Sequence, residues 1–123
     1  MKILFVCGRN KQRSPTAERI YANDPRVKVR SVGVGKTSTR RLREKDISWA
    51  DIIIVMEGKY KKRIVEASRS TYSSIIENLD IPDDYDFMDP ELISLIKDGT
   101  EYFIDLYASE IVSEQVAGGD ATR

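Results

Sequence analysis

The hydrophobic positions of the chain form short apolar runs that alternate with amphipathic segments. Residues 2–7 and 50–56 are apolar apart from Lys2 and Asp51, as in strands that are buried on both faces of a parallel sheet. Residues 27–31 alternate between apolar and polar side chains, which is typical of an edge strand. Residues 74–81 form a further run of strand-forming character. The pattern therefore predicts four strands.

Each predicted strand is followed by a segment in which apolar residues recur at helical spacing. In the last of these segments, Asp89 predicts an N-cap and Pro90 a first helical position, where no N–H is needed. Trp49 is expected in the core. The predicted helices cover residues 15–23, 40–49 and 57–68 and a long final stretch from residue 90.

Strands that alternate with helices predict an α/β fold, a doubly wound four-stranded parallel sheet with helices on both faces. We expect a single domain over residues 1–115 and a flexible C-terminal tail over residues 116–123. Ligands of such sheets bind beyond the carboxyl ends of the strands. The loops after the first and fourth strands are therefore candidate site loops.

The loop after the first strand has the features of an anion site. Cys7 ends the strand, and Ser14 and Pro15 predict a helix start with Ser14 as the N-cap. The tight loop between them turns backbone N–H groups inward, and the helix dipole adds positive potential at the same point. Arg13 is then able to grip two oxygens of a phosphate-like anion.

Cys7 lies where these amides, the dipole and the guanidinium all favour thiolate over thiol, so it is a candidate nucleophile. Ser14 is able to donate its hydroxyl to that sulfur. The alternative is that Cys7 is only a small core residue at the end of an apolar strand.

Composition narrows the function classes. The 123 residues include one cysteine and no histidine, which excludes an internal disulfide and histidine-based catalysis. The lone thiol fits a reducing cytoplasm, and the apolar start is too short for a signal peptide or a membrane span. Net charge is zero, yet residues 1–70 carry 18 Lys/Arg against 7 Asp/Glu and residues 71–123 carry 2 against 13. This split favours anionic ligands on one face.

The segment from Cys7 to Pro15 resembles the phosphate-binding loop of the low-molecular-weight protein tyrosine phosphatases, C-x-G-N-x-C-R-S-P. The resemblance implies that Cys7 is the nucleophile, Arg13 the phosphate clamp and Ser14 the partner of the thiolate. Asn10 would brace the loop. The implied phosphate-binding residues are Gly8, Arg9, Asn10, Lys11, Gln12, Arg13 and Ser14.

The chain departs from the family pattern at four places, of which the last is the absence of the family's Asp-Pro pair from the stretch after the fourth predicted strand. Arg9 stands where the family has glycine, and Gln12 stands where the family usually has a second cysteine. No aromatic residue lies between Val32 and Ile47, although the family has an aromatic wall of the substrate cleft in this region.

The family's general acid lies in an Asp-Pro-aromatic stretch after the last strand. The closest register here, residues 81–85, implies Asp83 as the acid and Tyr85 as an aromatic wall, with Asp84 in the cleft. Asp80 and Asp84 are rival acids, whereas Asp89 is better explained as a helix cap. Clustered carboxylates would help one of them to hold a proton.

These observations predict a metal-independent, cofactor-free cysteine phosphatase of the protein tyrosine phosphatase type that forms a phosphocysteine intermediate. Its substrate would be a phosphorylated protein or a small phosphomonoester, and Lys11 at the cleft rim favours one with extra negative charge. The main alternative is a non-catalytic phosphate-binding module. Arsenate reduction is disfavoured because Cys7 has no partner cysteine. A nucleic-acid role is disfavoured because no aromatic stacking platform accompanies the basic half.

Overall fold

The computed structural model of the chain describes residues 1–68 and 75–120, with side chains described up to residue 109. Four parallel strands form one sheet in the order β2-β1-β3-β4. The strands are β1 (Lys2–Cys7), β2 (Lys28–Gly33), β3 (Ile52–Val55) and β4 (Ile75–Asn78). The helices are α1 (Arg13–Tyr21), α2 (Glu44–Trp49), α3 (Tyr60–Ala67) and α4 (Pro90–Asp120). The predicted fold class is confirmed.

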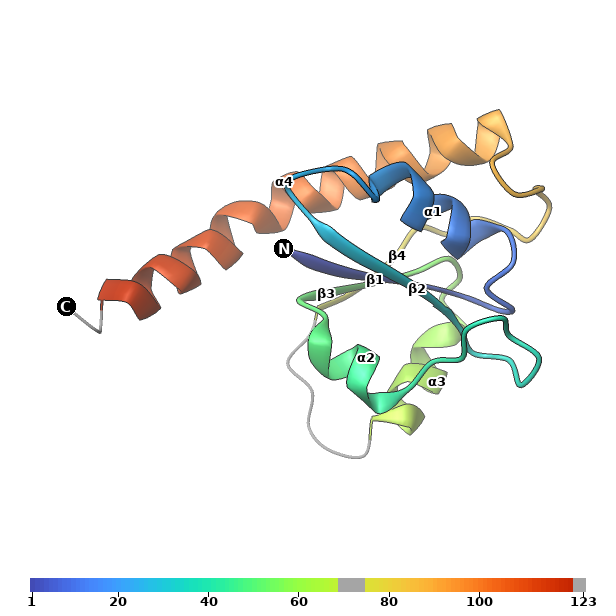
Figure 1. Cartoon of the computed structure of the whole chain (residues 1–123), viewed down its shortest axis with the longest axis horizontal. Coiled ribbons are helices and arrows are strands. Elements are labelled where there is room, and N and C mark those ends of the chain that lie inside the picture. Colours follow the sequence, from blue (N-terminus) through green and yellow to red (C-terminus); the bar gives the residue numbers. More distant parts are fainter. Residues whose placement is uncertain (69–74, 121–123) are drawn as a thin grey trace.

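The two central strands supply the middle of the core. Ile3 to Val6 in β1 and Ile52 to Val55 in β3 are completely buried. Helices cover both faces of the sheet: α1 and α4 lie on one face, and α2 and α3 lie on the other (Figure 1). Strands buried on both sides need no polar face, which explains the continuous apolar runs in the sequence. Cys7 is carried by β1 to the carboxyl edge of this sheet.

Helix α1 begins earlier than predicted, and the capping prediction for Ser14 is wrong. The N-cap is Gln12, which makes no side-chain capping bond, and Ser14 lies inside the first turn. Its hydroxyl bonds Cys7 instead, so a contact with the site has displaced the local capping preference. Pro15 still lies in the first turn, where its missing N–H costs nothing.

The predicted helix over residues 40–49 is also too long at its start. Arg41 forms a parallel bridge with Gly33 at the end of β2, so the chain is still extended there and α2 begins only at Glu44. At the other end of the chain, Asp89 caps α4 as predicted, since its Oδ1 accepts the N–H of Glu91 at 2.8 Å. Trp49 is half-buried against the core, and the Arg30 guanidinium lies 4.1 Å from its ring.

Helix α4 continues through Asp120 and projects past the sheet (Figure 1). The tail predicted over residues 116–123 falls partly on this helix and partly outside the described residues. Within residues 1–68 and 75–120, no helix combines the length and apolar character needed to cross a membrane.

Replacing Ile53 with alanine is expected to lower the free energy of unfolding by roughly 2–5 kcal/mol, because the side chain is fully buried in β3 and its removal leaves a cavity. The matched control is Val65→Ala in α3, where the side chain is 53% exposed and the cost should be below about 1 kcal/mol. Urea unfolding of both variants measures the difference. Equal destabilisation would show that β3 is not at the centre of the core.

Candidate active site

The loop of residues 8–12 joins the end of β1 to α1 and is held by the segment that follows β2. The carbonyl of Gly8 accepts the N–H of Gly35 at 2.8 Å, and the carbonyl of Arg9 accepts the N–H of Thr39 at 3.1 Å. Gly33 lets these two segments approach, because a Cβ at that position would lie 2.8 Å from the Asn10 nitrogen. The loop conformation is thus fixed from outside the loop itself.

Within the loop, the left-handed backbone position is Asn10, with φ 55°, and not Arg9. Asparagine tolerates this conformation better than other non-glycine residues do. Arg9 is therefore compatible with the loop although the family pattern has glycine there, which answers the first departure noted in the sequence.

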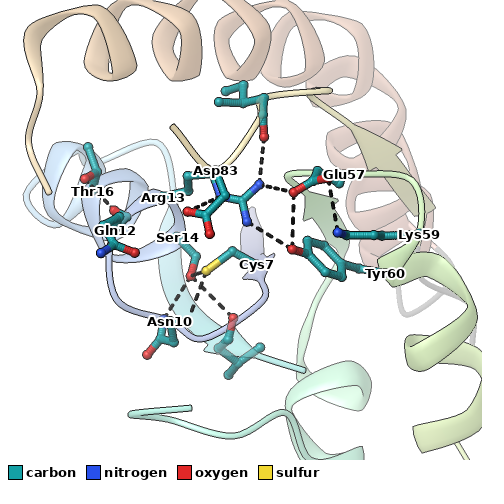
Figure 2. Close-up of polar contacts among 12 residues, drawn as sticks. Cys7, Asn10, Gln12, Arg13, Ser14, Thr16, Glu57, Lys59, Tyr60 and Asp83 are labelled. Carbon is teal, nitrogen blue, oxygen red and sulfur yellow. Dashed lines mark hydrogen bonds and ion pairs between the residues drawn. The ribbon is translucent and has the colours of Figure 1, made fainter. Parts of the chain in front are cut away.

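The Cys7 thiol is 2% exposed and has two polar neighbours. Its Sγ lies 2.8 Å from Ser14 Oγ, and the backbone N–H of Asn10 donates to it at 3.2 Å. Asn10 Nδ2 donates to Ser14 Oγ at 2.9 Å, and the single Ser14 proton has two acceptors within reach, the Cys7 sulfur and the Val32 carbonyl at 3.3 Å. Figure 2 shows these groups converging on Cys7. The Asn10 N–H and the Ser14 hydroxyl are thus both within reach to donate to the sulfur.

Arg13 is held from behind by three protein groups. Its Nη1 donates to Glu57 Oε1 at 2.5 Å and to the Ile81 carbonyl at 2.7 Å. Its Nη2 donates to Tyr60 Oη at 3.0 Å (Figure 2). Since Tyr60 also donates to Glu57, both partners lie along the Nη1–Nη2 edge of the guanidinium.

The opposite edge of the Arg13 guanidinium carries the Nε–H and the second Nη2–H, two parallel donors with the spacing that two phosphate oxygens need. Among the contacts of the described residues, this edge has only one partner, Asp83, whose Oδ1 lies 3.7 Å from Nε. That distance is too long for a hydrogen bond. Arg13 is therefore arranged as a clamp for an anion.

The same contacts keep Arg13 and its partner Glu57 ionised. Desolvation alone would raise the pKa of Glu57, but the hydrogen bond and charge of Arg13 outweigh it and the pKa is lowered. Burial alone would lower the pKa of Arg13, but its bonds to Glu57 and Tyr60 raise it. Desolvation raises the pKa of Tyr60, which keeps its phenol protonated as a donor to Glu57.

Backbone N–H groups complete the cradle. In the part of the chain that the structure describes, the N–H groups of Gly8, Arg9, Lys11 and Gln12 have no hydrogen-bond partner. Together with the forward edge of Arg13, they are available to an oxyanion above the Cys7 sulfur.

Three groups of this site were not predicted from the sequence. Glu57 and Tyr60 bond Arg13 across 44 and 47 residues of sequence, and no local spacing signals such contacts. The tyrosine also lies over the loop, because a Cβ at Gly8 would be 3.0 Å from its hydroxyl. The third group is Phe87, which lines a hollow beside Asn10 and Lys11.

The acidic loop after β4 brings one of the three candidate acids to Arg13. Asp83 approaches the guanidinium with a side chain that is 49% exposed. Asp80 lies at the strand end in a left-handed conformation, and its N–H bonds Asn78 Oδ1. Asp84 is exposed, and no ion pair of Asp84 with another described residue is found. The structure therefore brings Asp83, rather than its rivals, into contact with the clamp.

Of the two other residues predicted for the substrate cleft, Tyr85 lies against the core and Lys11 lies at the surface. Tyr85 packs against the core, and desolvation and the Glu91 carboxylate raise its pKa. Lys11 is exposed and lines the hollow that Phe87 also lines. Within residues 1–68 and 75–120, no three histidine, cysteine, aspartate or glutamate side chains are grouped to hold a metal ion.

Tyr60→Phe removes one of the three groups behind Arg13, and we expect it to weaken the binding of orthovanadate about fivefold, as for the loss of one hydrogen bond of about 1 kcal/mol. Titration calorimetry of the wild type and the variant measures this change.

The matched control is Tyr107→Phe in α4, which removes a phenol hydroxyl that donates to Glu77 Oε2 at 2.5 Å. It should leave vanadate affinity unchanged. An equal loss in both variants, or none in Tyr60→Phe, would contradict a positioning role for Tyr60.

No protein-family model matches the sequence, and the comparison with curated proteins found no match. Solved structures do match. Wzb from Vibrio vulnificus, in complex with benzylphosphonate, is 20% identical over 85% of this chain and 97% of that chain, with a TM-score of 0.67.

SP-PTP from Streptococcus pyogenes, a low-molecular-weight protein tyrosine phosphatase, is 21% identical over 85% of this chain and 91% of that chain, with a TM-score of 0.66. The YwlE arginine phosphatase from Geobacillus stearothermophilus is 26% identical over 94% of this chain and 95% of that chain, with a TM-score of 0.54. The resemblance of the loop after β1 is thus accompanied by a match in fold over 85% of the chain, which has the fold of the low-molecular-weight protein tyrosine phosphatases.

Proposed function

We propose that this protein is a metal-independent cysteine phosphatase that hydrolyses phosphomonoesters through a phosphocysteine intermediate. The observation that carries the proposal is the pairing, at the two ends of one loop, of the Cys7 sulfur with the edge of Arg13 that carries its Nε–H. Ser14 and the Asn10 amide stabilise the thiolate, and the rear contacts of Arg13 leave two donors for the phosphoryl group.

In the first step, the Cys7 thiolate attacks phosphorus and the bond from phosphorus to the leaving oxygen breaks. Arg13 and the loop amides stabilise the charge on the equatorial oxygens as this happens. Asp83 donates its proton to the leaving oxygen, so that an alcohol or phenol departs.

In the second step, the Asp83 carboxylate takes a proton from water, which attacks the phosphocysteine. The sulfur–phosphorus bond breaks, inorganic phosphate leaves and the Cys7 thiolate is restored. Ser14 is placed to donate to the departing sulfur. Because a free thiolate must stay reduced, we also propose a cytoplasmic location.

The substrate class follows from the rim of the site. Relatives in fold include a tyrosine phosphatase and an arginine phosphatase. Lys11 is a cation at the rim, which disfavours a cationic phosphoarginine and favours a phosphoester with nearby negative charge. We therefore favour a phosphorylated protein or another phosphomonoester with an anionic neighbourhood.

The test is hydrolysis of p-nitrophenyl phosphate between pH 5 and 7 without added metal. Cys7→Ser should abolish turnover, and Asp83→Asn should lower kcat by about 10²-fold or more, with the largest loss for poor leaving groups. Asp84→Asn and Asp80→Asn are matched controls that should retain most of the activity. Acid quenching should trap phosphate on Cys7 in the wild type.

Turnover that survives Cys7→Ser would refute the mechanism. If the wild type binds vanadate but hydrolyses no phosphoester, the protein is a non-catalytic phosphate-binding module, the main alternative from the sequence. Loss of activity in Asp84→Asn and not in Asp83→Asn would move the general acid to Asp84.

A further inference from the structure

Two adjoining hollows extend from the phosphate loop along the face of the sheet that α1 covers. The first, of about 740 Å³, begins at Asn10 and Lys11. The second, of about 800 Å³, continues between α1 and the edge strand β2 as far as Asn23 and Val27. They share Pro15, Glu18 and Phe87 as lining residues. We call the two together the α1–β2 groove; Figure 1 shows the two elements that form it.

The walls of the α1–β2 groove are basic along their whole length. Lys11 and Arg40 line the part next to the phosphate loop, and Arg19 and Lys28 line the far part. All four side chains are exposed. Within the described residues, no ion pair involves Lys11, Arg19 or Lys28.

Glu18 is the one carboxylate among the residues that line the two hollows, and it is already engaged. Its Oε1 accepts the Ser31 hydroxyl at 3.0 Å, and its Oε2 lies 3.4 Å from Arg40. The groove therefore carries an excess of uncompensated positive charge.

Phe87 gives the middle of the groove an apolar contact. Its side chain is 46% exposed, which is unusual for a phenylalanine, yet its position is fixed. The N–H of Met88 donates to Thr16 Oγ1 at 2.9 Å, and the N–H of Asp89 donates to the Asp86 carbonyl at 3.1 Å. These bonds tie the backbone next to Phe87 to α1, and the Phe87 ring lines both hollows.

We propose that the α1–β2 groove binds an acidic, extended segment that flanks the phosphorylated residue of a protein substrate. This inference rests on the proposed function and specifies its substrate. Helix α1 has nine residues and is ~14 Å long, which is the span of about four residues of an extended chain. The segment would place carboxylates near Arg19 and Lys28 and an apolar side chain on Phe87. A small phosphomonoester reaches only the Lys11 end.

The experiment compares kcat/KM for three substrates: p-nitrophenyl phosphate, a phosphotyrosine peptide with four acidic residues on one side, and the same peptide with serines in their place. Both peptides are made with the flank before and after the phosphotyrosine. The wild type should prefer one orientation of the acidic peptide over its serine counterpart by about tenfold, and the preference should fall as salt rises.

The double variant Arg19→Glu/Lys28→Glu should remove that preference by raising KM, with p-nitrophenyl phosphate turnover unchanged. The matched control is Lys45→Glu/Lys61→Glu, which changes net charge equally with exposed residues of α2 and α3 on the other face. Phe87→Ala should raise KM for a version of the acidic peptide that carries one apolar residue in its flank. It should leave KM for the peptide without that residue unchanged.

No preference for the acidic peptide in the wild type, or an equal loss in the control variant, would overturn the inference. So would a stronger preference for a 5′-phosphorylated oligonucleotide that Arg19→Glu/Lys28→Glu removes, since the groove would then serve a nucleic acid. If p-nitrophenyl phosphate is not hydrolysed, the proposed function fails separately. Fluorescence anisotropy of the labelled acidic peptide, with Arg19→Glu/Lys28→Glu, then tests the groove alone.

Discussion

The structure depends on keeping one guanidinium charged and oriented inside the protein. Arg13 is 2% exposed, and burying a cation is costly unless it is ion-paired and hydrogen-bonded. Those partners come from three separate places: Glu57 after β3, Tyr60 at the start of α3, and the Ile81 carbonyl beyond β4. The ion pair thus ties the loops at the carboxyl edge of the sheet to the first turn of α1. The charge that we propose to bind phosphate also holds the edge together.

This arrangement explains why the sequence predicts the strands well but predicts the contacts at their carboxyl ends less well. Strands β1 and β3 are buried on both faces, so hydrophobicity alone specifies them. Motif spacing pointed to Cys7 and Arg13 because they flank one short loop. Ser14 shows the limit of such reasoning: its local preference was for a helix cap, but the sulfur of Cys7 and the Val32 carbonyl are its partners in the fold.

Glu57, Tyr60 and Phe87 escaped sequence reasoning for a common reason. Each contacts or lies beside the phosphate loop from a segment that is distant in sequence, either after β3 or after β4. The local sequence of each is like that of an ordinary helix start or turn. Strand order decides these contacts: β3 lies beside β1, so the residues after β3 reach Arg13. Only a correct topology, and not a motif, would have brought them to the site.

Acidic and basic residues lie on different sides of the site at the carboxyl edge of the sheet. Their placement favours one path for a charged chain that leaves the site. The loop after β4 carries Asp83, Asp84 and Asp86, whereas the α1–β2 groove carries uncompensated cations. An acidic chain held by its phosphate at Arg13 is repelled along the first path and attracted along the second. The carboxylates among which we propose the general acid would therefore also exclude one route for the proposed substrate. In this proposal, catalysis and orientation of an acidic substrate both follow from a single segregation of charge between the two halves of the chain.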